Sequence, residues 1–378
     1  MPFPATMHVS RVNPNSPSDV KQFIEFPFWL YRDSSNWVPP LVSGEYQLFD
    51  QGKHPFYQHS TAQFYLAHRE NEVVGRIAVL HNRNYNRYHD STDAQFGYFE
   101  CVDDEETAQA LFDAAFTWTR RQGLDGIIGP KGLLGGEGAG ILVDGFDLRP
   151  PLGVSYHAPY YCNLIRNAGF IKDTDFLTAT VDTSYRLPDR VRQIAAYAQQ
   201  RRGYWVKRFS STSEARVWVD RVLTAHQKAF GGNKTYYPPT PAETSMLVDT
   251  LLRVLDLTAS RLIMVGDEII GFVLGVRDVS AGLQRARGRM WPIGWFHLLR
   301  ELRSTQLLNL NGLGLLPGYR GVGADAVLLA TLEEALRATN YKQAYLVQTE
   351  ESNSAMVTEV LRLGVTWRQR HRSYRRTL

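Results

Sequence analysis

The fold is decided between Leu308 and Asn340, where the sequence reads LNLNGLGLLPGYRGVGADAVLLATLEEALRATN. The apolar segment from Leu307 to Leu316 predicts a buried strand. The turn that follows contains Pro317, Gly318, Gly321 and Gly323. Apolar residues then recur at helical spacing on one face, at Leu328, Leu329, Leu332, Ala335 and Leu336. The stretch therefore predicts a strand, a glycine-rich turn and an amphipathic helix.

A glycine-rich turn that opens a helix can bind phosphate. Successive backbone N–H groups are exposed at a helix N-terminus, and the helix dipole favours an anion there. Glycine permits a close approach that a Cβ would block, and Arg320 adds a permanent positive charge beside the turn. The same glycines also suit a plain tight turn, so this stretch alone leaves both interpretations open.

The turn resembles the acyl-CoA loop of the GNAT N-acyltransferase superfamily, whose pattern is Q/R-x-x-G-x-G/A. The first five positions of the pattern are matched by Arg320, Gly321, Val322, Gly323 and Ala324. The sixth position is Asp325, where the family has Gly or Ala. A carboxylate in the first helical turn suits the helix dipole, but it repels a pyrophosphate held on the same amides.

The resemblance covers most of residues 204–378. After the strand AYLVQ, the family's N-x-x-A/M element and its Gly-Phe pair are matched by Asn353, Ser354, Ala355, Met356, Leu363, Gly364 and Val365. The resemblance implies that acetyl-CoA or another acyl-CoA is a cosubstrate. The residues that it places around the cosubstrate are Leu315, Leu316, Arg320, Gly321, Val322, Gly323, Ala324 and Asn353. The whole chain also resembles bacterial tandem-GNAT proteins.

The composition indicates a soluble globular protein. The chain has 378 residues, of which 44% are hydrophobic and 21% charged, and its formal net charge is only +4, so we expect no nucleic-acid partner. The cysteines, Cys101 and Cys162, have no zinc spacing, and neither do His81 and His89, so we expect no metal. Long apolar runs and a signal pattern are absent from the sequence, which predicts a cytoplasmic protein without a membrane partner.

An internal repeat divides the chain into two similar halves. The segments around Gly75 and Gly271, the strands at residues 9–12 and 206–209, and the segments ending near Gly169 and Gly364 match at offsets of 195 to 197 residues. The sequence therefore predicts two tandem domains, residues 1–190 and 191–378. Each is expected to be an α/β (α+β) domain with a mixed, twisted sheet flanked by helices, in agreement with the fold that the GNAT resemblance implies.

Each half carries one insertion. In the first half it is GPKGLLGGEGAGILVDGFDLRPP, a flexible loop or a substrate-gripping loop to which Lys131, Glu137 or Asp144 would contribute. In the second half it is SAGLQRARGRMWPIGWFHLLRE, which contains Arg287, Arg289, Trp291 and Trp295. This insertion could close over a substrate or pack against the other domain. The basic run from Arg368 to Arg376 reads as a last strand with a solvated face, or as a binding site for acidic groups.

Residues that would carry acyl transfer are hard to find. Many GNAT enzymes have a tyrosine four residues before the Gly of Gly-Phe, whereas this chain has Val360 and, in the first half, Ile165. Four other residues could serve as acid or base, although no motif places them near the reaction: Tyr236, Tyr237, Glu268 and Tyr374. The first half's equivalent turn carries Asp103, Asp104, Glu105 and Glu106, which suit helix capping and disfavour phosphate.

Two functions follow from these patterns. The first is acyl-CoA-dependent transfer of an acyl group, expected to be acetyl, to an amine of a small molecule or peptide. The second is a non-catalytic ligand-binding protein built on two degenerate GNAT folds. The missing tyrosine and Asp325 favour the second function, and the Arg320–Ala324 turn favours the first. The catalytic residues and the oligomeric state are not readable from the sequence.

Overall fold

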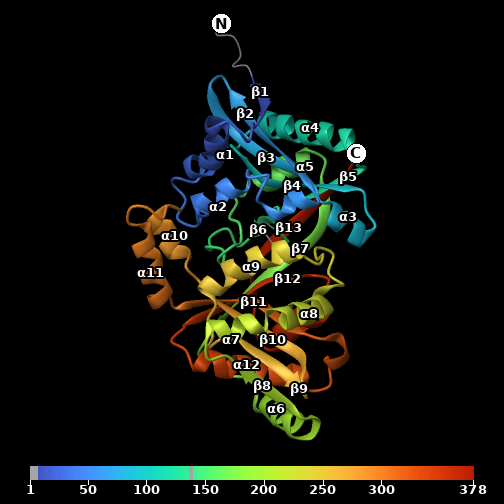
Figure 1. Ribbon diagram of the computed structural model, residues 1–378, viewed down its shortest axis with the longest axis vertical. Helices are drawn as coiled ribbons and strands as arrows, with labels where there is room; N and C mark the ends of the chain where they lie inside the picture. Colours follow the sequence, from blue (N-terminus) through green and yellow to red (C-terminus); the bar gives the residue numbers. More distant parts are fainter. Residues whose placement is uncertain (1–6, 136–138) are drawn as a thin grey trace. The chain divides into compact units, whose positions relative to one another are not determined.

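A computed structural model describes residues 7–135 and 139–378 and resolves them into two compact units, each described here by itself (Figure 1). Unit 1 comprises the chain up to Phe176 together with Ala281–His297 and Gln369–Leu378. Unit 2 comprises Leu177–Ser280 and Leu298–Arg368. The predicted division at residue 190 concerns the repeat in the sequence and stays a prediction. The units show in addition that the last strand of the chain belongs to unit 1.

Unit 1 is a mixed sheet with helices on both faces. Its elements are β1 (Met7–Arg11), α1 (Pro17–Leu30), α2 (Val42–Gln47), η1 (Pro55–Gln58), β2 (Thr61–Arg69), β3 (Glu72–His81), α3 (Arg83–His89), β4 (Asp93–Cys101), α4 (Glu105–Arg121), β5 (Gly126–Gly129), β6 (Ile141–Asp144), α5 (Tyr161–Asn167), the first part of β7 (Ile171–Asp182), α10 (Ser280–Ala286) and β13 (Trp367–Thr377). Strands β1 to β4 pair antiparallel in chain order, β4 pairs parallel with β5, and β13 pairs antiparallel with β5 and β6.

Unit 2 repeats this plan. Its elements are the end of β7, α6 (Asp189–Arg202), β8 (Tyr204–Arg208), α7 (Thr212–Val217), α8 (Val219–Phe230), α9 (Pro241–Val254), β9 (Arg261–Val265), β10 (Glu268–Arg277), most of α11 (Gly294–Ser304), β11 (Leu307–Leu315), η2 (Pro317–Tyr319), α12 (Ala324–Arg337), β12 (Gln343–Glu350) and α13 (Ser354–Arg362). Strands β8 to β11 pair antiparallel in chain order, and β11 pairs parallel with β12. The predicted strand, turn and helix from Leu307 onward are β11, η2 and α12.

Local sequence explains where the main helices begin. The Asp104 side chain caps α4 by accepting a hydrogen bond from the Thr107 amide at 2.8 Å, as short acidic side chains at this position commonly do. Helix α9 begins with a capping box, in which Thr240 and Glu243 satisfy each other's backbone amides. The acidic first-half turn is therefore a helix cap, as its sequence predicts.

Apolar cores lie on both faces of each sheet. In unit 1, α4 covers one face and α1 the other, with Phe112 and Phe23 fully buried. In unit 2, α6 and α12 cover the face that holds Leu308 and Leu310, and α8 covers the face that holds Phe272. Helices on both faces of a mixed sheet, predicted for each half, are confirmed.

The basic run at the C-terminus forms β13, whose side chains make specific contacts within unit 1. Arg372 makes a bidentate ion pair with the buried carboxylate of Asp175, at 2.7 and 3.0 Å. This pairing holds the pKa of Asp175 below its usual range although burial opposes it. The Arg376 guanidinium stacks over Phe116. These arginines stabilise the end of the unit 1 sheet.

Candidate functional site

The glycine-rich turn of unit 2 needs glycine at two positions. Gly321 and Gly323 have φ angles of 72° and 96°, which side chains with a Cβ rarely adopt. Gly323 is also close to α6, because a Cβ added to it would lie 3.0 Å from the Cβ of Ala198. The turn therefore places α12 directly after β11, with the α12 N-terminus beside α6.

Backbone amides are available at this N-terminus. The N–H groups of Val322, Gly323 and Ala324 donate to no acceptor among the described residues. The N–H of Gly321, by contrast, donates to Oδ2 of Asp325 at 2.5 Å. The turn thus has three free donors for an anion, and a fourth that the protein's own carboxylate already occupies.

Arg320 ties the turn to its surroundings. Its Nε donates to the carbonyl of Leu315 at 3.1 Å, and its Nη2 donates to the carbonyl of Ala229 at 3.0 Å. The guanidinium therefore joins the end of β11 to the end of α8. These two anchors fix the shape of the turn.

Strands β11 and β12 form a fork. Their parallel pairing runs only from Leu307 opposite Gln343 to Leu310 opposite Leu346. Beyond this point β11 continues to Leu315 while it still pairs with β10, and β12 continues to Glu350. The facing backbone edges of the two strands separate after the Leu310–Leu346 pair, on the side where β11 leads into the glycine-rich turn.

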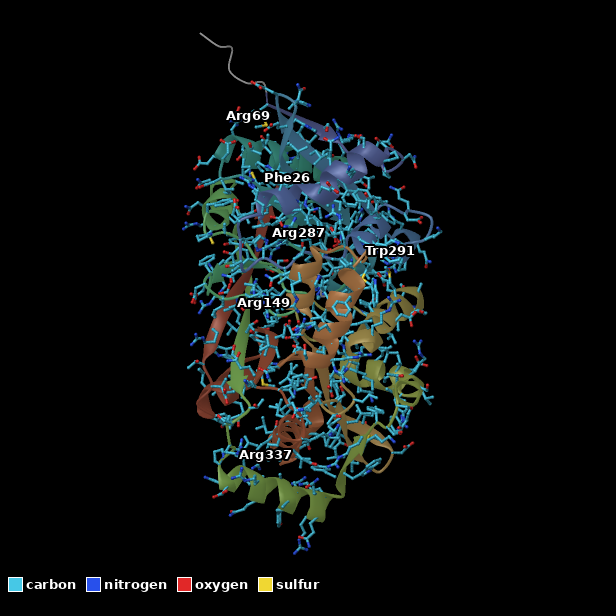
Figure 2. All side chains as sticks on the ribbon, turned by 90° about the vertical axis from the view of Figure 1, so that its left-hand side faces the viewer. Phe26, Arg69, Arg149, Arg287, Trp291 and Arg337 are labelled. Carbon is cyan, nitrogen blue, oxygen red and sulfur yellow. The ribbon has the colours of Figure 1, made fainter. Side chains whose placement is uncertain are left out.

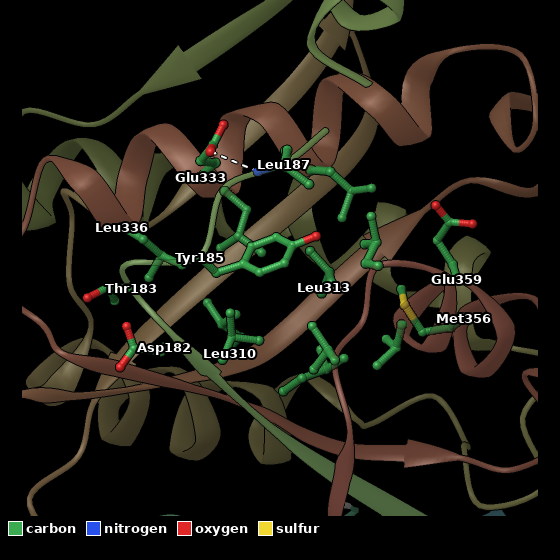
Figure 3. A pocket seen from close by; sticks show the side chains of 17 residues that line it. Asp182, Thr183, Tyr185, Leu187, Leu310, Leu313, Glu333, Leu336, Met356 and Glu359 are labelled. Carbon is green, nitrogen blue, oxygen red and sulfur yellow. Dashed lines mark hydrogen bonds between the residues drawn. The ribbon is translucent and has the colours of Figure 1, made fainter. Parts of the chain in front are cut away.

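A pocket lies where the fork begins (Figure 3). It is lined by β11, β12, α12, α13 and the segment after β7, through Val181, Asp182, Thr183, Tyr185, Leu187, Leu310, Leu313, Leu329, Leu332, Glu333, Leu336, Leu346, Met356, Glu359, Val360, Leu363 and Val365. Its cavity volume is about 80 Å³, which is smaller than the roughly 300–1,000 Å³ of typical small-molecule pockets. The last paired residues of the fork, Leu310 and Leu346, belong to its lining.

The pocket offers apolar surface, and most of its polar groups are occupied. Glu333 accepts from the Leu187 amide at 3.0 Å and from Arg192 at 3.1 Å, and the first of these bonds is drawn in Figure 3. Thr183 Oγ1 donates to the Tyr341 carbonyl at 2.6 Å. A ligand of this pocket would therefore be held mainly by burial of apolar area.

The remaining predicted cosubstrate residues lie in two places. Leu315 and Leu316 are buried at the end of β11, next to the turn, so the structure brings them together with residues 320–324. Asn353 instead caps α13, where its Oδ1 accepts from the Met356 amide at 3.3 Å. Val360, at the position of the missing tyrosine, lines the apolar pocket, whereas Ile165 is buried in the core of unit 1.

Unit 1 has a corresponding fork, and its own side chains fill it. Strands β4 and β5 pair only from Asp93 to Gln95. Farther along β4, the hydroxyl of Tyr160 donates to the Cys101 carbonyl at 2.7 Å, and the hydroxyl of Tyr161 accepts from the Cys101 amide at 3.2 Å. The backbone groups of Cys101, which a ligand could otherwise pair with, are therefore already satisfied.

A polar cluster that the sequence did not reveal lies at the same place in unit 1. The hydroxyls of Tyr31 and Tyr161 donate to Oε2 of Glu100 at 2.7 and 2.6 Å. Burial raises the pKa of Glu100, and the charge of Arg76 opposes that shift. The residues come from the C-terminal cap of α1 and from β3, β4 and α5, and no motif in the sequence connects them.

Asn309 is a polar residue in the otherwise largely apolar strand β11. Its side chain is 1% exposed, and neither its amide nitrogen nor its amide oxygen has a hydrogen-bond partner among the described residues. Asn309 is next to Leu310 in the strand, so its side chain points to the opposite face of the sheet from the pocket. A buried amide without partners is a candidate contact for a polar ligand group.

The other candidate residues are engaged elsewhere. Tyr374 is buried in β13 of unit 1, where burial raises its pKa to about 12, and Glu268 accepts from Tyr319 at 3.1 Å. Tyr237 donates to Glu243, and the ring of Tyr236 lies at a tilt beside that of His226. In the first insertion, Lys131 lies over the ring of Tyr85, Asp144 ends β6, and Glu137 lies outside the described residues.

Within residues 7–135 and 139–378, no group of three His, Cys, Asp or Glu side chains is placed to hold a metal ion. The helices of this part of the chain include none with the length and apolar character needed to cross a bilayer.

Comparisons with known proteins agree with this architecture. No family model matches the chain. It is 26% identical to the bacterial ceramide synthase of Caulobacter vibrioides, with 100% of both chains covered, and 25% identical to protein YghO of Escherichia coli, covering 96% of this chain and 93% of that one. It is also similar to a solved tandem GNAT protein from the clavulanic acid biosynthesis pathway, with a TM-score of 0.56, 11% identity and 98% of both chains covered. The predicted tandem fold is confirmed.

Proposed function

We propose that this tandem GNAT protein is an acyl-CoA-dependent N-acyltransferase whose unit 2 holds the acyl donor. The observation that carries the proposal is the β11–β12 fork, which opens between the free amides of residues 322–324 and the apolar pocket beside Leu310 and Leu346. Free amides suit phosphates, unpaired strand edges suit an amide-containing arm, and the pocket suits an aliphatic chain. These three features follow one another along β11.

The acyl group that we propose is longer than acetyl. The GNAT resemblance alone predicts acetyl, which would leave the apolar pocket empty. One relative is named a ceramide synthase, and a ceramide is a fatty-acyl amide of a long-chain amino alcohol. We therefore propose a fatty-acyl donor and, as acceptor, the amine of a small lipid-like molecule. Each methylene that enters the pocket would contribute about 0.8 kcal/mol, roughly fourfold in affinity.

The chain's own residues would position the reactants. Transfer forms one C–N bond, breaks the thioester C–S bond and releases a proton from the attacking ammonium. The unpaired edge of β11 would orient the donor. Asn309, on the face of the sheet opposite the pocket, would contact a polar group of a reactant. Val360 replaces the family's tyrosine, so the thiolate that leaves would take its proton from solvent or from the acceptor side.

A rival function is a non-catalytic binding protein. The bond from the Gly321 amide to Asp325 favours it, because this bond fills part of the anion site without a ligand. In that case the apolar pocket would bind a lipid, and the glycine-rich turn would have only the structural role of connecting β11 to α12.

Calorimetric titration with CoA, acetyl-CoA, octanoyl-CoA and palmitoyl-CoA tests the proposal. We expect affinity to rise with chain length. Val360→Phe, which fills the pocket, should weaken palmitoyl-CoA binding at least about tenfold and leave CoA binding unchanged. Leu361→Phe is the matched control, since Leu361 is 54% exposed on the same helix and does not line the pocket.

The outcomes separate the alternatives. Equal affinity for all four ligands would show that the pocket does not bind the acyl chain. The proposed reaction would then be acetyl transfer. Failure of every CoA ester to bind saturably would overturn the transferase function and leave the rival binding protein. If palmitoyl-CoA binds, release of CoA from it with long-chain and short-chain amines then identifies the acceptor.

A further inference from the structure

A group of large apolar side chains is exposed in the connection between α10 and α11 and in the first turn of α11. The segment reads MWPIGWF from Met290 to Phe296. Its five large side chains, here called the apolar tip, are 43% to 80% exposed: Met290 43%, Trp291 80%, Ile293 64%, Trp295 45% and Phe296 54%. Scattered exposed apolar residues are ordinary on protein surfaces, but a contiguous group of this size commonly marks an interaction site.

The apolar tip is presented by a fixed base on unit 1. The Gly288 carbonyl accepts from the Val42 amide at 2.9 Å, and Gln284 donates to the Trp37 carbonyl at 2.9 Å. Gly288 also lies so close to the chain that a Cβ there would meet the Pro40 carbonyl. Helix α10 is therefore anchored beside α2, as Figure 1 shows, while the tip that follows it stays exposed.

Basic residues flank the apolar tip in the sequence. Residues 281–304 contain five arginines and one carboxylate, at Arg285, Arg287, Arg289, Arg300, Arg303 and Glu301. Arg289 pairs with Glu25 at 2.7 Å and lies over Phe28. Arg287 is exposed and has no partner among the described residues. Figure 2, which looks onto this side of the molecule, labels Arg287 and Trp291 there.

We propose that the apolar tip binds the surface of an anionic lipid bilayer. Trp291, Ile293 and Phe296 would enter the boundary between head groups and acyl chains, where tryptophan is enriched in membrane proteins. Arg287, which is exposed and has no partner among the described residues, would contact anionic head groups. A second copy of this chain fits less well, because it would bring the same positive charge against Arg287.

This inference departs from the expectation of no membrane partner. That expectation rested on the lack of a long apolar run, which concerns spanning a bilayer, whereas the tip would only attach to its surface. The inference stands on exposure and charge and does not require the proposed function. If both hold, the tip would bring the acyl-transfer site to the phase in which long-chain substrates reside.

Vesicle co-sedimentation of the full chain tests the inference. The vesicles are phosphatidylcholine alone and phosphatidylcholine with phosphatidylglycerol. We expect binding to the second kind, weakened by salt. A triple variant combines Trp291→Ser, Ile293→Ser and Phe296→Ser, and it should reduce the bound fraction at least about tenfold. Arg287→Glu should reduce binding to the anionic vesicles.

The control is Val217→Ser with Tyr197→Ser, which removes two apolar side chains that are 79% and 63% exposed elsewhere and should leave vesicle binding unchanged. Replacement at such exposed sites changes stability little, which thermal melting checks. Failure of the native chain to bind anionic vesicles, or equal binding by the triple variant, overturns the inference. A third result would also overturn the inference: the native chain forms a dimer in sedimentation velocity, binds no vesicles, and loses the dimer in the triple variant. The tip would then contact a second copy of the chain.

Discussion

The Gly321 N–H donates a hydrogen bond to the Asp325 carboxylate, with 2.5 Å between the nitrogen and Oδ2. The acceptor is four residues farther on, in the first turn of α12. The carboxylate therefore occupies one of the backbone donors at which a phosphate would bind, and its charge repels phosphate from the others.

The first prediction concerns this bond. Asp325→Asn should raise the affinity for CoA esters about tenfold, because a repulsion of about 1.4 kcal/mol is removed, and the gain should shrink as salt is added. Calorimetry at low and high ionic strength measures it. Asp220→Asn, in the first turn of α8, makes the same charge change away from the turn and serves as the control. Unchanged or weaker binding by Asp325→Asn would contradict the assignment of the anion site to residues 321–324.

The second prediction concerns the filled fork of unit 1. Tyr161→Phe removes hydrogen bonds to the Glu100 carboxylate and to the Cys101 amide. We expect the free energy of unfolding to fall by about 1–3 kcal/mol and the affinity for CoA esters to stay the same, because unit 1 does not hold the donor. Urea unfolding and calorimetry measure the two quantities. Tyr197→Phe, at a hydroxyl that is exposed, should change neither. A loss of affinity in Tyr161→Phe at unchanged stability would place the donor in unit 1.

The third prediction concerns Asn309. A buried amide without partners destabilises a protein by about 1–3 kcal/mol, so Asn309→Leu, which keeps the size of the side chain, should raise the free energy of unfolding by that order. If the amide contacts a reactant, the same variant should lower kcat/KM for acyl transfer. Asn82→Leu is the contrast, because Asn82 is equally buried but accepts from the Tyr85 amide at 3.0 Å and should destabilise. If Asn309→Leu instead lowers the free energy of unfolding, the Asn309 amide has hydrogen-bond partners in solution.

The repeat and the glycine-rich turn were sufficient to predict the tandem fold, because each depends on local sequence. Gly75 and Gly271 occupy equivalent positions on β3 and β10, and Leu307–Leu315 forms the strand that precedes the turn. The pairing of β13 with β5 could not be predicted, since strand alternation specifies which face is buried and leaves the partner open.

The candidate site was predicted only in part. The turn residues Arg320 to Ala324 do lie together at the α12 N-terminus, and the predicted conflict with Asp325 takes the form of a direct hydrogen bond. The apolar pocket escaped prediction because Tyr185, Leu310 and Val360 meet only through tertiary packing. The exposure of Trp291 likewise depends on how α10 is anchored, which periodicity does not report.

The last prediction concerns acid sensitivity. His226 on α8 is surrounded by aromatic rings, with centroids 4.7 Å from Phe230 and 5.9 Å from Phe272. Burial lowers its pKa from 6.5 to about 4. Between these two values the unfolded chain binds a proton that the folded chain excludes, so stability is lost as pH falls from 6.5 towards 4. The shift corresponds to roughly 3 kcal/mol once both pKa values are passed.

His226→Phe should remove this part of the acid sensitivity, because phenylalanine takes up no proton. His157 and His371 also have pKa values lowered by burial, the second to about 4, so the variant should keep a smaller slope in the same window. An aspartate with a lowered pKa, such as Asp256, changes the stability mainly as pH falls below its ordinary pKa of 3.8. Such groups therefore contribute little over this pH range. Urea unfolding of both proteins at a series of pH values from 7 to 4.5 measures the difference in stability. Parallel curves over this range would show that His226 is protonated in the folded protein, and that its aromatic surroundings admit water.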